Sequence, residues 1–343
     1  MKNKKMFITL FIILVSNFTF GWRARSPWCW SGRIIWDHDA TTKISTISFP
    51  IGSIWRQEIL DSLAQWNNMR GMAFEFDPIT NDTNGTYRLG NGDNEIVFTD
   101  NSGAGGNLGV TSLRFGICWF GQEIREADIQ FNNEIIWEIA DHDPRLRETT
   151  ANFRFTAVHE MGHFLGLLHE DNRMAVMQST ASGFFGGSAY TRVHPFPDDC
   201  VGSRTLYPHG NREMDIAISN FRWVSSNNTG LILPAGTITV RRGDTFTTGF
   251  AFGNLGNEHA EFDWIIVLST NEIISTYDRT VLSGSGWGTP GYYGDFTFTA
   301  RIPSDMPVGL YHAGGILDPY NNLPEGREGN NWVVFPGPIL VIP

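Results

Sequence analysis

The sequence predicts an α+β domain followed by an all-β domain. Its 343 residues, of which 41% are hydrophobic and 13% aromatic, suit two globular domains. A strand, a long helix and further strands are expected before a second helix in the first part of the chain, and short strands alone in the rest. The net charge of −11 disfavours nucleic acid or an anionic membrane as a partner.

The N-terminus has the pattern of a secretory signal peptide. Lysines near the start precede the apolar run 6–15, and Thr19 and Gly21 fit positions −3 and −1 of a cleavage site. The apolar run is too short to span a membrane comfortably. We therefore expect residues 1–21 to be a signal peptide and the mature chain to be secreted and extracellular, without stable membrane insertion.

Helical and strand patterns follow one another in the first domain. Ser53 is a good N-cap for a helix that ends near Met69, because apolar residues recur there at helical spacing. A polar loop is expected at 81–92. Alternating or short apolar runs predict strands at 43–49, 73–76, 95–99, 108–111 and 127–132.

The first domain is organised around three histidines in the pattern H-E-x-x-H-x-x-G-x-x-H. His159 and His163 are four residues apart, so on a helix they lie one turn apart on one face and can bind one ion. Gly166 can adopt a positive φ that ends the helix and returns His169 as a third ligand. Three protein nitrogens leave the fourth tetrahedral position open, as in a catalytic zinc site. Glu160 is then placed to act on a zinc-bound water as general base.

The alternative to a metal site is that these residues are ordinary core residues of a buried helix. Two histidines at this spacing can be core residues, and so can a methionine such as Met177. Three histidines in register with a glutamate and a glycine favour the metal site.

The extended motif is the metzincin signature, and Ala175-Val176-Met177 resembles the methionine turn of the matrixin branch, with Met177 as its methionine. A second stretch resembles the matrixin strands before the zinc helix, carried by Asp128, Ile129, Phe131, Glu134 and Trp137 in that order. The resemblance covers roughly residues 28–208.

This resemblance implies a metzincin fold, with a twisted mixed sheet plus long helices, over residues 22–208. It also implies a zinc metalloendopeptidase with one catalytic Zn²⁺ and a protein or peptide as substrate. The loop 178–197, with Phe184, Phe185 and Tyr190, would wall the main primed-side substrate pocket. The histidines for a second, structural zinc are missing, and Ca²⁺ near the strands is left open.

The three cysteines, Cys29, Cys118 and Cys200, permit a disulfide in a secreted protein, but spacing does not choose the pair. Asp198 and Asp199 begin the last helix of the first domain. In matrixins the mature N-terminus reaches this helix, so the resemblance implies a Cys29–Cys200 disulfide.

After Pro208 the sequence pattern changes from mixed helices and strands to short strands alone. Residues 209–214 are expected to be a linker, and six or seven short strands in residues 215–343 predict a β-sandwich. The region resembles the CARDB type of immunoglobulin-like domain, which implies a surface or matrix ligand. This resemblance rests on Asn254-Leu255-Gly256, Ser269 with Asp278, Ile302-Pro303, Gly309-Leu310-Tyr311 and Asp318 through Asn331. Asp318, Glu325 and Glu328 are interpreted as solvated turn acids rather than cation ligands.

Two functions of different classes follow from these patterns. The intact set of three histidines and Glu160 favours a secreted metalloendopeptidase. The alternative is a secreted binding or adhesion protein whose metzincin domain is inactive. The sequence does not name the natural substrate or its cleavage preference.

Overall fold

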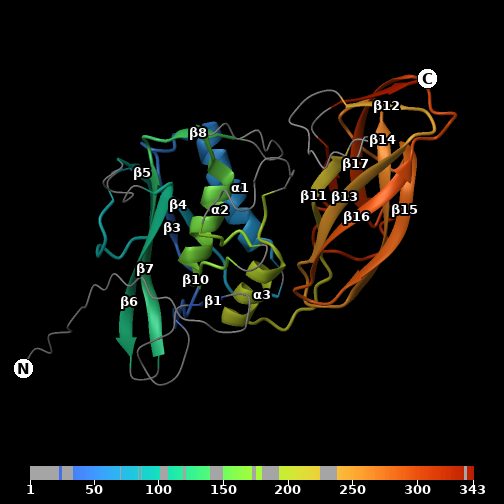
Figure 1. The fold of residues 1–343 in the computed structure, drawn as a ribbon. Helices are drawn as coiled ribbons and strands as arrows, with labels where there is room; N and C mark the ends of the chain where they lie inside the picture. The colour runs from blue at the N-terminus through green and yellow to red at the C-terminus, as the bar shows by residue number, and fades with distance from the viewer. Residues whose placement is uncertain are drawn as a thin grey trace, which may run out of the picture.

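The computed structural model describes residues 23–24, 34–69, 71–83, 85, 87–100, 107–118, 121–139, 150–171, 175–179, 193–224, 238–335 and 338–343. The predicted signal peptide and Cys29 lie outside these residues. The described elements form two groups, with α3 (Pro197–Leu206) on the side of the first group that faces the second (Figure 1).

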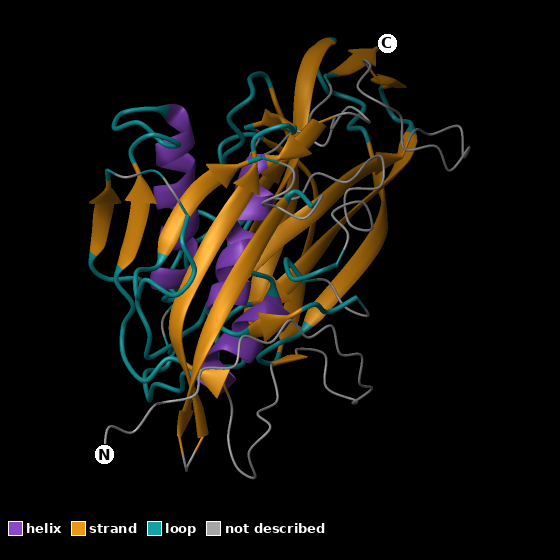
Figure 2. Cartoon of the chain, turned by 90° about the vertical axis from the view of Figure 1, so that its left-hand side faces the viewer, coloured by secondary structure: helices purple, strands orange, loops and turns teal. Residues whose placement is uncertain are grey.

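The first group is built on a six-stranded sheet with the order β2-β7-β5-β3-β4, in which β6 pairs with β7. All pairs are parallel except β6–β7, which is antiparallel. The helices lie behind this sheet in Figure 2, so one sheet face is covered. The strands are β2 (Ile34–Ile35), β3 (Thr42–Ser45), β4 (Ile79–Asp82), β5 (Glu95–Thr99), β6 (Gly109–Cys118) and β7 (Gly121–Asn132).

Two helices cover the sheet. The helix α1 (Ile54–Asn67) starts at the predicted N-cap, since the Ser53 hydroxyl accepts a hydrogen bond from the backbone nitrogen of Arg56. It ends two residues before the predicted Met69. The second helix, α2 (Phe153–Phe164), carries the histidine motif. Short strand pairs flank it, namely β8 (Ile136–Glu138) with β9 (Thr150–Asn152) and β1 (Arg23–Ala24) with β10 (Leu167–Leu168).

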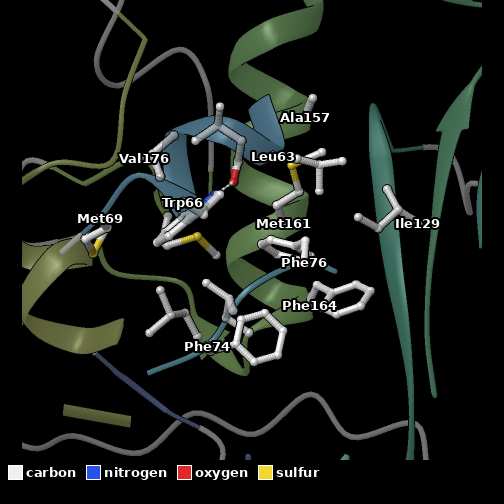
Figure 3. Packing of buried hydrophobic residues seen from close by; sticks show 14 of the residues in the cluster. Leu63, Trp66, Met69, Phe74, Phe76, Ile129, Ala157, Met161, Phe164 and Val176 are labelled. Atoms are coloured by element: carbon white, nitrogen blue, oxygen red, sulfur yellow. Dashed lines mark hydrogen bonds between the residues drawn. The ribbon is translucent and has the colours of Figure 1, made fainter. Parts of the chain in front are cut away.

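The core of this domain lies between α1, α2 and the sheet (Figure 3). Trp66 of α1 is fully buried, and its indole nitrogen donates to the carbonyl oxygen of Val158 in α2 at 3.1 Å. Met161 and Phe164 of α2 lie in the same cluster as Ile129 of β7. Full burial of side chains of this size contributes about 1.5–3 kcal/mol each to folding. The helix that bears the motif is therefore held on two sides.

Two expectations for this domain are wrong in detail. The segment 73–76 is not a strand, although Phe74 and Phe76 are buried, because its amides bond elsewhere: Phe76 N donates to the side chain of Asn67. The strand β4, which pairs in parallel with β3, occupies the start of the region expected to be a polar loop.

The second group contains two sheets, of order β11-β13-β16 and β12-β19-β17-β14-β15, with β18 paired to β17. Apolar side chains from both sheets form one hydrophobic core. The immunoglobulin-like class of this arrangement stays a prediction. The strands are β11 (Ile216–Val224), β12 (Ile238–Arg241), β13 (Thr245–Asn254), β14 (Ala260–Ser269), β15 (Arg279–Gly288), β16 (Tyr293–Arg301), β17 (Gly309–Leu317), β18 (Trp332–Val334) and β19 (Ile339–Ile342).

Buried polar contacts join the two groups. Arg204 of α3 donates to the carbonyl oxygen of Leu255 and forms an ion pair with Glu213, which lies in the predicted linker and is 3% exposed. Arg327 donates to the carbonyl oxygen of Gln65 in α1 at 3.4 Å. The end of the first domain is therefore packed against the second rather than separated from it by a solvated spacer.

Candidate metal centre and catalytic site

The helix that carries the first two histidines has well-formed ends. The Asn152 side chain accepts from Phe155 N at 2.9 Å, so Asn152 is the N-cap of α2. At the other end Gly166 has φ +94°, and a Cβ there would lie 2.9 Å from the carbonyl oxygen of Ile34. A larger residue would be strained at this positive φ, and its Cβ would clash with the Ile34 carbonyl oxygen. The chain turns here and reaches His169 through β10.

The three predicted ligands converge. The candidate ligand atoms of His159, His163 and His169 all lie within 4.8 Å of one another, and Nε2 of His163 is 3.1 Å from Nε2 of His169. Zinc–nitrogen bonds of 2.0–2.1 Å in a tetrahedral site separate the ligand nitrogens by about 3.3 Å. The spacing of this pair therefore suits one zinc ion.

The other ring nitrogens of two ligands are already engaged. Nδ1 of His159 is 2.7 Å from the carbonyl oxygen of Val176, and Nδ1 of His163 is 2.8 Å from that of Leu167. A carbonyl can only accept, so in both neutral rings the proton lies on Nδ1 and Nε2 keeps its lone pair. For His163 that lone pair faces His169, an arrangement that a bound cation stabilises.

Desolvation favours the neutral form of two of the three imidazoles. It lowers the pKa of His159 to about 4 and also lowers the pKa of His169. Neutral imidazole is the form that binds metal, so His159 and His169 are ready at neutral pH without first losing protons.

Glu160 lies in α2 beside the first ligand and is 4% exposed. Burial raises the pKa of Glu160 to about 7, and a hydrogen bond from Thr111 opposes this shift. A dication bound nearby would favour the charged carboxylate and lower this pKa. The position and the environment suit a group that exchanges a proton with water near neutral pH.

The predicted methionine turn lies against the zinc helix. Met177 is buried, and a Cβ on Gly162 of α2 would overlap its sulfur. The backbone nitrogens of Val176 and Met177 donate to the carboxylate of Asp199 at 2.7 and 3.3 Å. The start of α3 thus holds the turn, a link between distant segments that the sequence did not reveal.

The residues that carry the resemblance before the zinc helix support its start. Asp128, Ile129 and Phe131 lie in β7, and the rings of Phe131 and Trp137 pack on Phe153, the first residue of α2, with ring centres 4.9 and 5.3 Å away. Phe131 and Trp137 therefore brace the start of the zinc helix.

A second group of potential ligands occurs in the described part of the chain, formed by Asp37, His38 and Glu123. Asp37 and His38 are exposed, and Glu123 is held by Arg125 at 2.6 Å, so this group is a solvated ion-pair cluster. Neither group has the all-oxygen ligand set that calcium prefers, and calcium stays an open prediction.

The expected Cys29–Cys200 disulfide is wrong for this structure. Cys200 is a free, fully buried thiol in α3, and its Sγ lies 3.7 Å from the carbonyl oxygen of Pro195. Burial raises the pKa of this thiol to about 12, so it is unreactive at neutral pH. The aromatic residues predicted to wall the substrate pocket, Phe184, Phe185 and Tyr190, lie outside the described residues.

Comparison with solved structures returns weak likenesses for part of the chain. A CARDB domain from Pyrococcus furiosus, solved in complex with di-metal ions, is 14% identical with a TM-score of 0.27 and covers 38% of this chain and 90% of its own. A β-glucosidase from Listeria innocua is 11% identical with a TM-score of 0.24 and covers 44% and 17%. A Niemann-Pick type C2 protein from the Japanese carpenter ant is 11% identical with a TM-score of 0.24 and covers 39% and 96%.

Comparison with protein families is more specific. No curated protein matches the sequence significantly. The family model for matrixins, which are zinc-dependent metallopeptidases, matches residues 42–208. This range contains the histidines, Glu160 and the turn at Met177. Over residues 42–208 this chain is therefore similar to the matrixins, as the sequence motifs predicted.

Proposed function

We propose that this protein is a secreted zinc metalloendopeptidase that hydrolyses peptide bonds. The observation that carries the proposal is the convergence of three imidazoles, whose candidate ligand atoms lie within 4.8 Å of one another, beside the buried carboxyl group of Glu160. The match to the matrixin model supports the same reaction class. Secretion rests on the pattern of residues 1–21, and none of the described helices is long and apolar enough to cross a membrane.

In this proposal the histidines bind zinc and Glu160 is the general base. His159, His163 and His169 would hold the ion through their Nε2 atoms, and Met177 would pack beneath the helix that carries the first two. Zinc, when bound, supplies Lewis acidity toward water and toward the scissile carbonyl. Glu160 takes a proton from the attacking water on a carboxylate oxygen and passes it to the leaving amine.

The free edge of β6 offers a place for the substrate. β6 pairs with β7 along one side, and no described strand pairs with its other side. Residues 108–111 at its start adjoin α2 through the contact between Thr111 and Glu160. An extended peptide can add to such an edge by backbone hydrogen bonds, which would lay a scissile bond across the site.

The second domain has a separate part in the proposal. We assign residues 215–343 to a CARDB-type immunoglobulin-like domain that binds a surface or matrix ligand. Its two sheets around one core are compatible with such a domain.

The test uses the mature chain from residue 22, loaded with zinc. Elemental analysis should find one zinc per chain in the wild type and a large loss in His163→Ala. The wild type should cleave members of a peptide library and lose activity with a chelator. Glu160→Ala should keep its zinc and lose about 10²–10⁴-fold in kcat, the typical contribution of general acid–base catalysis. A zinc-loaded wild type that cleaves no peptide would instead favour the binding protein with an inactive domain.

A further inference from the structure

The carboxyl group of Glu160 contacts the edge strand β6 at one residue. Thr111 is 9% exposed, and its hydroxyl oxygen lies 2.6 Å from Oε2 of Glu160 and 2.9 Å from the main-chain oxygen of the same residue. Within the described part of the chain, no other group donates a hydrogen bond to this carboxylate.

We propose that Thr111 is a positioning residue that fixes the carboxylate of the general base. The inference rests on the proposed function and adds a residue to it. By holding Oε2, the hydroxyl sets the rotation of the carboxylate and leaves Oε1 for the water. Thr111 itself need not touch the reacting atoms.

Neighbouring features of β6 support this role. A Cβ on Gly109 would lie 2.9 Å from both Cγ and Oε1 of Glu160, so the glycine leaves the space that the side chain occupies. Threonine is β-branched and its χ1 angle is restricted, which gives its hydroxyl a defined direction. The strand therefore supplies both the room and the hydrogen bond.

The hydrogen bond at Oε2 suits both the charged and the protonated form of Glu160. While the carboxylate is charged, the hydroxyl donates to Oε2, and such charge-assisted bonds are the stronger kind. Once Oε1 holds the proton from water, Oε2 is the carbonyl oxygen of the acid and still accepts from the same hydroxyl. The contact can be kept in both states without moving the helix.

Three substitutions separate the hydroxyl from the shape of the residue. Thr111→Val keeps the shape and removes the hydroxyl, and Thr111→Ser keeps the hydroxyl. Thr42→Val is the matched control, because Thr42 is a fully buried threonine in β3 of the same sheet, and its hydroxyl donates to the carbonyl oxygen of Ala40. All three are assayed with zinc on the same peptide substrate.

Thr111→Val should lower kcat by about 10–100-fold, the range expected for a lost hydrogen bond to a charged group. Its KM and its zinc content should stay near those of the wild type, because neither depends on the rotation of the carboxylate. Thr111→Ser should recover kcat to within about threefold of the wild type. Thr42→Val should keep the wild-type kcat.

Crystal structures of the zinc-loaded wild type and Thr111→Val supply a readout besides activity. The Glu160 carboxylate should have one orientation in the wild type and a changed orientation in the variant.

A Thr111→Val enzyme with wild-type kcat would overturn the inference, as would a Thr111→Ser enzyme that is equally impaired. If Thr111→Val does not fold, Thr111→Ala replaces it as the hydroxyl-free variant, and failure of both to fold would assign Thr111 a structural role instead. A wild type that cleaves nothing would reject the proposed function. The two crystal structures would still decide whether Thr111 orients Glu160.

Discussion

Asp199 and Val176 are 23 residues apart in the chain, yet the Asp199 carboxylate accepts a hydrogen bond from the Val176 backbone nitrogen at 2.7 Å. The carbonyl oxygen of the same Val176 is the partner of Nδ1 of His159. The start of α3 is thus connected, through one residue of the turn, to the orientation of a metal ligand.

Asp199→Ala should therefore weaken zinc binding without removing a ligand. Loss of groups that orient metal ligands typically costs about 10–100-fold in affinity, and we expect a loss in that range. Asp199→Asn keeps one acceptor oxygen and should lie between Asp199→Ala and the wild type. Zinc affinity is measured by competition with a chelator, with the exposed Asp305→Ala as control. Unchanged zinc affinity in Asp199→Ala would show that Asp199 of α3 does not help to orient the metal site.

Gly162→Ala should destabilise the first domain. The added Cβ would overlap the Met177 sulfur and lie 3.3 Å from the Trp66 ring, in a part of the core with no spare room. Overpacking of this kind typically costs about 1–3 kcal/mol. Gly210→Ala is the matched control, since a Cβ there meets nothing within 4 Å. Denaturant unfolding measures the free energy of unfolding of both variants. Equal values would show that the Met177 side chain can move aside at little cost.

Arg204→Ala should strongly destabilise the chain, because it removes the ion pair of the buried Glu213 at the contact between the domains. Breaking a buried pair in this way typically costs about 3–5 kcal/mol. The control is Arg279→Ala, which removes an exposed pair with Asp305 and should cost no more than about 1 kcal/mol. Thermal unfolding measures both, and similar midpoints would mean that Glu213 finds water or another partner.

The buried carboxyl group of Asp128 should make stability depend on pH. Burial raises the pKa of Asp128 to about 8. The folded state then binds the proton more tightly than the unfolded state, whose aspartate has a pKa of about 3.9. The stabilisation is fully present below about pH 4 and is lost as the pH rises through 8, at no more than about 1.4 kcal/mol per pH unit.

Urea unfolding in the presence of a chelator tests this dependence, and Asp128→Asn should flatten it between pH 4 and 8. An unchanged pH profile in the variant would assign the dependence to other groups. Adding Ca²⁺ at pH 8 examines the open calcium alternative, because a calcium ion bound by Asp128 would restabilise the wild type and not the variant.

Some strands could not be predicted because their stability comes from their neighbours. β15 contains four glycines or serines in a row and has low intrinsic strand propensity. In the sheet, Gly284 and Gly286 pair with Trp264 and Phe262 of β14, and a Cβ on either glycine would crowd the facing ring. Conversely, the alternation at 73–76 correctly marked buried residues but not a strand, since a strand needs a pairing partner.

The sequence by itself determined the spacing of the three histidines and Glu160 and the turn at Gly166, because each depends on helix geometry over a few neighbouring residues. Only the tertiary structure decided that Thr111 hydrogen-bonds to Glu160, 49 positions away, and that Arg204 binds Glu213 across the domain contact. Such contacts depend on how strands and helices pack, and no local periodicity encodes which distant hydroxyl or carboxylate will meet. The candidate ligands lie within one short segment, so the sequence reveals them. The residues that orient them come from distant segments, so only the folded structure reveals those contacts.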